Sequence, residues 1–344
     1  MQRHKIAFTI CLGLAVTLFS SAALAQYQLT NLDSNQAKTA KFMDPLQVNG
    51  WGLARSSGGP FWVSDQGSGW STIYTGKGVK EGLEVLIPTA SGAGPGQPTG
   101  IVLNGSSDFQ VQGWPAIFLF ATLDGTISGW APQSNPNDAL IAVDNSKSGA
   151  VYTGLAITNK ASGNFLYAAD NANNKVDVFD GNFNPVPSAS FTDPALPAGF
   201  APFGIQDIEG LVYVAYAGPA EAAGGYIDIF REDGTLVGTF FHGAPLNQPW
   251  GMTMAPANFG PLSNTLLISN NTDTGTINAF SLNNGHGQFV GTVKDTNGKD
   301  IVINQLWGIE FGGGAANNGK TNQLFFTSGP YNNLAGTFGV IAFK

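Results

Sequence analysis

The sequence predicts an all-β protein, a six-bladed β-propeller with four strands in each blade. The first observation is a glycine that opens an apolar run and recurs roughly every 50 residues. The second is that further short strands follow each such run, with apolar and polar residues alternating along them. The third is the composition: 46 glycines and 19 prolines in 344 residues fit a fold built on many tight turns.

The first strand of each predicted unit begins at the recurring glycine. These starts are Gly52 ("WGLARS"), Gly100 ("TGIVLN"), Gly154 ("TGLAIT"), Gly204 ("FGIQDI"), Gly251 ("WGMTMA") and Gly308 ("WGIEFG"). In a propeller the innermost strands crowd around a central channel, and glycine lets their backbones approach. Trp51, Trp250 and Trp307 come directly before three of these glycines, and we expect them to pack between blades rather than to line the channel.

A second and a third strand follow the first in every unit. The second strands are expected over residues 61–65, 117–124, 165–170, 211–217, 265–270 and 323–329. The third are expected over residues 71–76, 126–130, 175–180, 226–230, 276–280 and 339–343. A weaker fourth strand is expected in five units, over residues 84–88, 140–144, 188–193, 236–242 and 288–293.

The sixth unit ends on its third strand and has no fourth of its own. The segment "YQLTNL", Tyr27 to Leu32, is a spare alternating strand. We expect it to pair with "GVIAF" of the last blade, which would close the ring and cover two open sheet edges. The alternative is a frayed terminus without regular structure.

Residues 1–25 have the pattern of a secretory signal peptide. A basic start, "MQRHK", precedes a short apolar run and the small residues "SSAALA". We expect cleavage after Ala25, export to the periplasm or the outside of the cell, and a single propeller domain over residues 26–344. Cys11 lies in this leader, so the remaining chain would have no cysteine and would depend on its apolar core.

Charge and composition exclude several classes of partner and cofactor. The net charge is −8, which disfavours nucleic acid and anionic membrane surfaces. No later segment has the length and apolarity of a membrane span. Only His242 and His286 remain after the leader, which argues against a zinc centre. We expect a monomer with no certain cofactor.

Several motifs resemble one known family. "NGWGLARSSGGPFWVSDQGSGWSTIY", "LYAADNANNKVDVFD", "PLNQPWGMTMAPANFG" and "LWGIEFG" are similar to an uncharacterised family of exported bacterial NHL-like six-bladed propellers, some of which end in a PEP-CTERM sorting tail. The resemblance covers most of residues 27–344, and it implies a propeller fold and export. It supplies no catalytic residues. The chain stops on a strand without the Pro-Glu-Pro tail of the sorted members.

Polar residues cluster in two sets of turns that a four-stranded blade places on one face. The turn that enters the first strand contributes Asn49, Gln97, Gln248 and Asn304, and the turn after the second strand contributes Asp65, Asp124, Asp170 and Asn270. These oxygens suit a polyhydroxylated ligand or Ca²⁺, for which Asp170, Asp124 and Asp65 would be the metal ligands. The alternative is that they form turns and bond their own backbone.

Two functions remain open from the sequence. The first is an exported binding or scaffolding module for a protein, peptide or glycan at the channel mouth. The second is a hydrolase or lactonase that uses a divalent cation in the central channel. Glu310 is the only glutamate expected on an innermost strand, so carboxylates for the second function are scarce.

Overall fold

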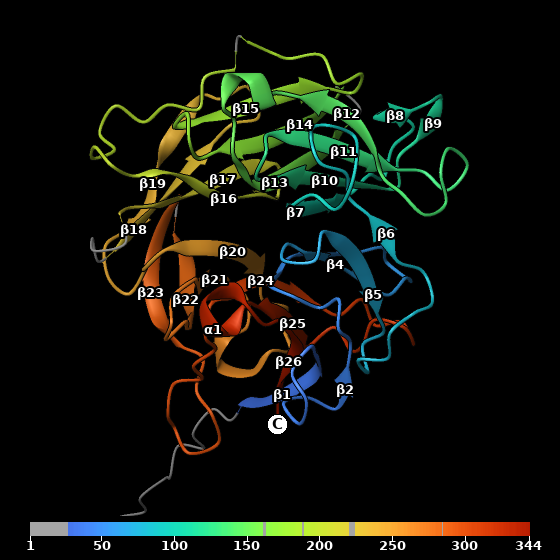
Figure 1. The fold of residues 1–344 in the computed structure, drawn as a ribbon. Coiled ribbons are helices and arrows are strands. Elements are labelled where there is room, and N and C mark those ends of the chain that lie inside the picture. Colours follow the sequence, from blue (N-terminus) through green and yellow to red (C-terminus); the bar gives the residue numbers. More distant parts are fainter. Residues whose placement is uncertain (1–26, 161–162, 188, 220–223, 284) are drawn as a thin grey trace, which may run out of the picture.

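A computed structural model describes residues 27–160, 163–187, 189–219, 224–283 and 285–344 (Figure 1). The signal peptide expected over residues 1–25 lies outside these ranges. The structure confirms the predicted fold, a six-bladed β-propeller. Among the described residues, no helix is long and apolar enough to cross a membrane.

Six sheets form the blades, numbered here in chain order from blade 1 and described from the axis outward. Blade 1 is β3 (Gly50–Arg55), β4 (Phe61–Asp65), β5 (Trp70–Tyr74) and β6 (Val85–Leu86); blade 2 is β7 (Pro98–Leu103), β10 (Phe118–Thr122), β11 (Thr126–Trp130) and β12 (Leu140–Asp144). Blade 3 is β13 (Tyr152–Lys160), β14 (Gly163–Asp170) and β15 (Lys175–Asp180); blade 4 is β16 (Ala201–Ile208), β17 (Leu211–Ala217), β18 (Gly225–Phe230) and β19 (Leu236–His242). Blade 5 is β20 (Pro249–Met254), β21 (Leu266–Asn270), β22 (Ile277–Asn283) and β23 (His286–Thr292); blade 6 is β24 (Leu306–Phe311), β25 (Gln323–Ser328), β26 (Thr337–Phe343) and β1 (Tyr27–Ser34).

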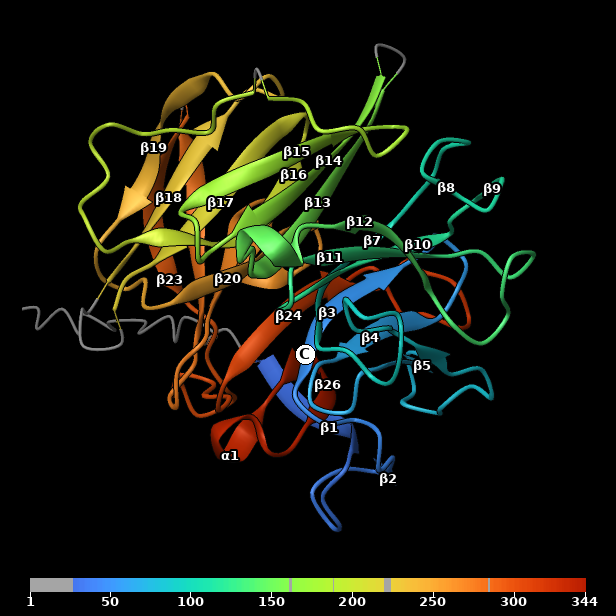
Figure 2. The ribbon, with the colours of Figure 1, turned by 45° about the horizontal axis from the view of Figure 1, so that its top comes forward.

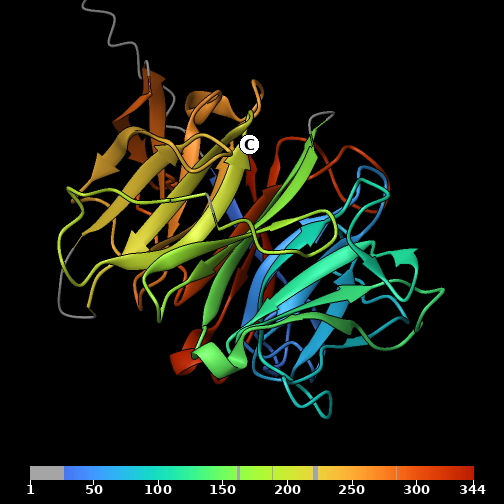
Figure 3. The same cartoon turned by 90° about the horizontal axis from the view of Figure 1, so that it is seen from above.

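The innermost strands of the blades surround the axis in chain order. Strand β3 contacts β7, and the contacts continue through β13, β16, β20 and β24 back to β3. Figure 2 shows these strands around the middle of the molecule, with the outer strands at its periphery, and Figure 3 gives the same blades from above. The chain therefore passes once around the ring.

The N-terminal strand closes the ring as predicted. Strand β1 pairs antiparallel with β26, from Tyr27 opposite Phe343 to Ser34 opposite Thr337. The blue and red strands lie side by side in Figure 1. Tyr27 is buried, and its hydroxyl donates a hydrogen bond of 2.7 Å to the Phe259 carbonyl oxygen of blade 5. A short strand, β2 (Phe42–Met43), extends this sheet outward.

Blade 3 differs from the prediction at its outer edge. The fourth strand expected over residues 188–193 is not formed in its described part, residues 189–193. The chain still begins to pair with β15, because the Val186 amide donates to the Val178 carbonyl oxygen. Pro185 and Pro187 lack the N–H that a ladder needs, which explains why pairing stops. Phe191 instead packs its ring against Tyr167 and Phe230.

A few elements outside the blades were not expected from the sequence. They are a hairpin of β8 (Gln110–Val111) and β9 (Trp114–Pro115), two 3-10 turns, η1 (Ser146–Ser148) and η2 (Gly260–Leu262), and one helical turn, α1 (Pro330–Asn333). In α1, Tyr331 and Asn332 have φ values of 58° and 56°, so the turn is left-handed there.

The recurring glycines lie where neighbouring inner strands touch. A Cβ atom added at any of the six would lie within 3.0 Å of main-chain atoms of the next inner strand. Gly52 faces Thr99, Gly100 faces Leu155, Gly154 faces Phe203, Gly204 faces Trp250, Gly251 faces Trp307, and Gly308 faces Trp51. Each blade therefore meets the next through a glycine, and the last meets the first, as the sequence predicted.

The core is divided among the interfaces between blades. Buried apolar side chains of the described residues form six clusters, and each cluster joins two neighbouring blades. Strand β25 shows how this arises: Phe325 enters the cluster with blade 1, whereas Leu324 and Phe326 enter the cluster with blade 5. Because side chains alternate along a strand, both faces of each blade are buried.

We predict that Gly204→Ala destabilises the protein, because the new methyl group would collide with the Trp250 carbonyl oxygen across the blade interface. The expected loss in the free energy of unfolding is about 2 to 4 kcal/mol. Gly58→Ala is the matched control, since nothing lies within 4 Å of a Cβ at that position. Equal unfolding midpoints for the two variants in chemical denaturation would contradict this account of the ring.

We also predict that the strand that closes the ring is essential for stability. Removing residues 1–34 deletes β1 and exposes the edge of β26, and we expect the melting temperature to fall by about 10 °C or more. The comparison protein lacks only residues 1–25 and keeps β1. Circular dichroism melting of both proteins tests this, and coincident melting curves would show that β1 contributes little.

Candidate functional site

Aromatic side chains close one end of the central channel. The rings of Trp51 and Trp307 stack with centroids 3.6 Å apart, and Trp250 meets both edge-on at 6.4 and 5.9 Å. Phe203 of blade 4 lies 6.4 Å from Trp51 of blade 1, and these two blades stand opposite each other in the ring. Side chains of opposite blades therefore meet on the axis and block it.

The tryptophans thus differ from the expectation that they would pack between blades. Two of them are held across the axis by hydrogen bonds from their indole N–H groups. Trp307 Nε1 donates to Asn49 Oδ1 at 2.8 Å, and Trp250 Nε1 donates to the Thr153 carbonyl oxygen at 2.9 Å. The Trp51 indole nitrogen is buried without a partner among the described residues. We call these three residues and Phe203 the tryptophan plug.

The other end of the channel opens into a pocket of about 420 Å³, which we call the axial pocket. It lies at the carboxyl ends of the inner strands, and all six blades contribute to its wall. A narrow continuation of about 40 Å³ runs inward as far as Trp250. The volume of the axial pocket is within the range of small-molecule sites, and the tryptophan plug closes its inner end.

Arg55 and Glu310 lie side by side in the wall of the axial pocket. Arg55 Nε lies 3.4 Å from Glu310 Oε1 and also donates to the Phe311 carbonyl oxygen at 2.8 Å. The Glu310 side chain is 26% exposed, but its Oε2 atom is buried and has no hydrogen-bond partner among the described residues. Burial raises the pKa of Glu310 to about 8 although Arg55 acts in the opposite direction. The carboxyl group is therefore protonated at neutral pH.

The remaining wall combines two polar side chains with an apolar lining. Gln206 and Thr253 contribute the polar groups, and Leu53, Ile101, Ile157, Met252, Met254 and Phe311 are among the apolar residues. Sequence reasoning did not select Arg55, Gln206 or Thr253. A signal was available, because each of them follows the recurring glycine by two or three positions in an inner strand that is mostly apolar.

The aspartates predicted at the channel mouth are held by hydrogen bonds within separate blades. The Thr72 amide and hydroxyl both donate to Asp65 Oδ2, and Asp65 is fully buried. Asp124 accepts from the Ala90 amide and the Thr122 hydroxyl. Asp170 accepts from the Val151 amide and from the side chain of Asn173. Each of the three aspartates therefore accepts hydrogen bonds within the fold, from neighbouring strands and from the loops that enter the blades.

The predicted amides have similar partners. Asn49 is buried and donates to Gln66 in addition to accepting from Trp307, and Asn270 donates to the Pro245 carbonyl oxygen. Gln248 donates to the Gly218 carbonyl oxygen, and Asn304 donates to that of Asp273. Gln97 is exposed, and its carbonyl oxygen accepts from the Leu123 amide.

None of the eight predicted mouth residues lines the axial pocket. Within the described residues, no three His, Cys, Asp or Glu side chains come close enough together to hold a metal ion. A role for Asp65, Asp124 and Asp170 in binding Ca²⁺, or for the amides in binding a ligand, stays a prediction.

Fold and pocket together define this protein as a six-bladed β-propeller with one end of its channel plugged and the other open. No protein-family model matches the sequence. Uncharacterized protein R648 of Acanthamoeba polyphaga mimivirus is 31% identical over 339 residues, which cover 93% of this chain and 81% of the viral protein. The chain belongs to the family of that protein. The family found is therefore viral and not the exported bacterial family that the motifs resembled, and only the propeller fold of that resemblance is confirmed.

Solved propellers share the architecture at low sequence identity. A virginiamycin B lyase from Staphylococcus aureus matches 92% of this chain and 99% of its own, with 13% identity and a TM-score of 0.53. A glucose dehydrogenase matches 91% of this chain and 98% of its own, with 10% identity and a TM-score of 0.58. Likeness at this level establishes the fold alone.

We predict that Glu310→Gln stabilises the protein in a pH-dependent way. The folded chain keeps the Glu310 proton up to about pH 8, whereas the unfolded chain loses it near the ordinary value of 4.5. The unfolded state thus binds fewer protons between these values, so Glu310 costs the wild type stability as pH rises through that window. The variant, which has no proton to lose, should melt at the wild-type temperature at pH 4 and several degrees higher at pH 9.

The matched control for this experiment is Glu81→Gln, which changes an exposed glutamate in a surface segment. Its melting temperature should differ little from that of the wild type across the same pH range. A constant difference between Glu310→Gln and the wild type from pH 4 to pH 9 would show that Glu310 is not protonated at neutral pH.

Proposed function

We propose that this chain is a ligand-binding propeller that takes a small molecule, or the end of a peptide or glycan chain, into the axial pocket. The observation that carries the proposal is the Glu310 carboxyl group in the pocket wall, beside Arg55, with one oxygen buried and without a partner among the described residues. A strongly perturbed carboxyl group in a concave site is typical of functional positions. The binding end is then opposite to the one that the sequence suggested.

The polar and apolar groups in the wall of the axial pocket favour a ligand that has both acceptor oxygens and an apolar part. Protonated Glu310 and the Arg55 guanidinium are hydrogen-bond donors, so a suitable ligand presents acceptor oxygens to that side of the pocket. Met252, Met254 and Phe311 offer an apolar surface to the rest of the ligand. Methionine side chains adapt to different shapes, which suits a pocket that accepts a chain end. Nothing in this chemistry requires a metal ion.

A catalytic role is the second candidate, favoured by the pKa of Glu310. A carboxyl group with a pKa of about 8 carries a proton at neutral pH and can act as a general acid. Propellers of this architecture include a virginiamycin B lyase and a glucose dehydrogenase, so the fold accommodates enzymes. Binding remains the primary proposal because a single acid does not define a reaction.

Export belongs to the same proposal. The basic, apolar and small-residue segments of residues 1–25 support secretion of the propeller. An exported binding module would meet its ligand outside the cytoplasm. The test is whether a reporter fused behind residues 1–25 leaves the cytoplasm of the native host.

We predict that ligands of the axial pocket lose affinity when Gln206 is replaced by Trp. Gln206 is exposed in the pocket, and an indole there would fill space that the ligand needs. A thermal-shift screen of small acids, peptides and oligosaccharides would first find compounds that raise the melting temperature. At one hundred times its dissociation constant a ligand stabilises by about 2.7 kcal/mol. Titration calorimetry should then show at least a tenfold loss of affinity in Gln206→Trp.

The matched control is Gln133→Trp, which places the same side chain on an exposed loop of blade 2 outside the pocket. Its affinity should equal that of the wild type. If the ligand accepts the Glu310 proton, affinity also falls above about pH 8 in the wild type but not in Glu310→Gln. Ligands that bind both tryptophan variants and Glu310→Gln equally well would place the binding site elsewhere.

A further inference from the structure

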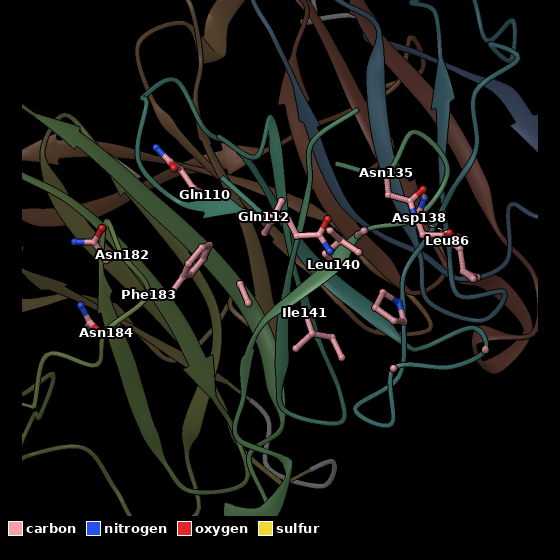
Figure 4. A pocket seen from close by; sticks show the side chains of 16 residues that line it. Leu86, Gln110, Gln112, Asn135, Asp138, Leu140, Ile141, Asn182, Phe183 and Asn184 are labelled. Carbon is pink, nitrogen blue, oxygen red and sulfur yellow. Dashed lines mark hydrogen bonds between the residues drawn. The ribbon is translucent and has the colours of Figure 1, made fainter. Parts of the chain in front are cut away.

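A wide groove lies on the rim of the propeller, far out along blade 2. Its volume is about 910 Å³, and strand β12 forms its floor with Leu140, Ile141 and Ala142. Loops of blades 2 and 3 supply its polar walls. Their side chains are Gln110 and Gln112 from the β8–β9 hairpin, Asn135 and Asp138 before β12, and Asn182 and Asn184 after β15. Figure 4 shows the hairpin and the two other groups placed around Leu140 and Ile141. We call this feature the rim groove.

Two of the amide side chains in the groove have no structural task. Gln112 and Asn182 are exposed and form no side-chain hydrogen bond with other described residues. Gln112 has a φ of 51° and Phe183, beside Asn182, a φ of 62°. Gln112 and Gly113 form the two-residue turn between β8 and β9, where positive φ values are usual, so the turn holds the Gln112 side chain at the edge of the groove. By contrast, Asn135 is fully engaged with the backbone of its own turn and with Asp138.

The backbone of β12 adds further hydrogen-bonding groups. The Ala139 amide donates to the Leu86 carbonyl oxygen, so this side of the segment faces β6. Beyond Leu86 the chain turns away at Pro88, and β12 is the outermost strand of its sheet. Because residues two apart point the same way, the N–H and C=O of Ile141 face the open groove.

We propose that the rim groove binds a neutral oligosaccharide. Amide groups donate and accept at once, which matches hydroxyl groups that also do both. None of the described residues that line the groove is Lys or Arg, so phosphate or sulfate groups have no counter-charge there. Leu140, Ile141 and the half-buried ring of Phe183 offer apolar patches to the C–H faces of sugar rings. The site is separate from the axial pocket and does not depend on its function.

The experiment compares three proteins on one set of probes. An array of neutral oligosaccharides of glucose, galactose, mannose, xylose, rhamnose and N-acetylglucosamine is probed with residues 26–344 of the wild type. The second protein is Gln112→Gly with Asn182→Ala, which removes the two unengaged amides and puts glycine where φ is positive. The third is Asn317→Ala, a matched control at an exposed asparagine of blade 6 whose side chain forms no described hydrogen bond.

The proposal expects saturable binding of at least one oligosaccharide by the wild type and Asn317→Ala, and at least tenfold weaker binding by the double variant. Binding that the double variant loses belongs to the rim groove, because neither Gln112 nor Asn182 lines the axial pocket. Absence of saturable binding to every oligosaccharide overturns the proposal. Oligosaccharide binding that the double variant retains overturns it as well. Binding of extended peptides on a peptide array, without binding of any oligosaccharide, also overturns it.

Discussion

The close contact between inner strands is the constraint on which the molecule depends. Six glycines, one in each blade, lie against the main chain of the next inner strand, and none has room for a side chain. Hydroxyl groups complete several of these contacts: Ser269 accepts from the Gly251 amide and donates to the Trp307 carbonyl oxygen, and Thr327 bridges Gly308 and Trp51 in the same way. Main-chain contacts therefore hold neighbouring blades together at the axis. The apolar clusters hold them together further out.

The close contact of the inner strands at their glycines makes one end of the channel narrower than the other. The residue before the glycine lies at the entry of the inner strand, where the ring is tight, and in three blades it is tryptophan. Large rings there can only meet across the axis, so they close that end. Two or three residues later the strands have space between them, and side chains such as Glu310 and Arg55 stand around a cavity. Strand direction thus decides which end can hold a ligand.

Most of the fold could be predicted from the sequence because its signals are local. The recurring glycine, the alternation of apolar residues and the spare strand at Tyr27 can each be recognised in a short segment of the sequence. The outer edge of blade 3 could not be predicted as surely, because the prolines at 185 and 187 oppose a ladder that the alternation alone favours. The axial pocket was harder still. Its wall combines residues from six blades, and which of them face the axis depends on how the ring closes.

Turn chemistry explains why the polar residues chosen from the sequence were a different set from those in the pocket. Asp and Asn after a strand can bind ligands or stabilise turns, and the sequence does not distinguish the two roles. Asp170 and Asn270 each hold backbone groups of neighbouring loops. The sequence shows that Glu310 is the one glutamate expected on an inner strand. Its raised pKa could not be predicted from the sequence, because it depends on the burial of the carboxyl group and on the nearby Arg55.

Raised pKa values alone do not identify the site, because carboxyl groups in blades 1 and 6 away from the axial pocket have them too. Burial also raises the pKa of Asp33 to about 7 and that of Asp65 well above its usual range. These carboxyl groups lie near Asp44, whose contacts include Lys80 at 2.8 Å and the Tyr74 hydroxyl, and neither lines the axial pocket. Burial is the largest cause of both raised pKa values. Glu310 shares the perturbation but faces a cavity that a ligand can enter, and that difference in access makes it the functional candidate.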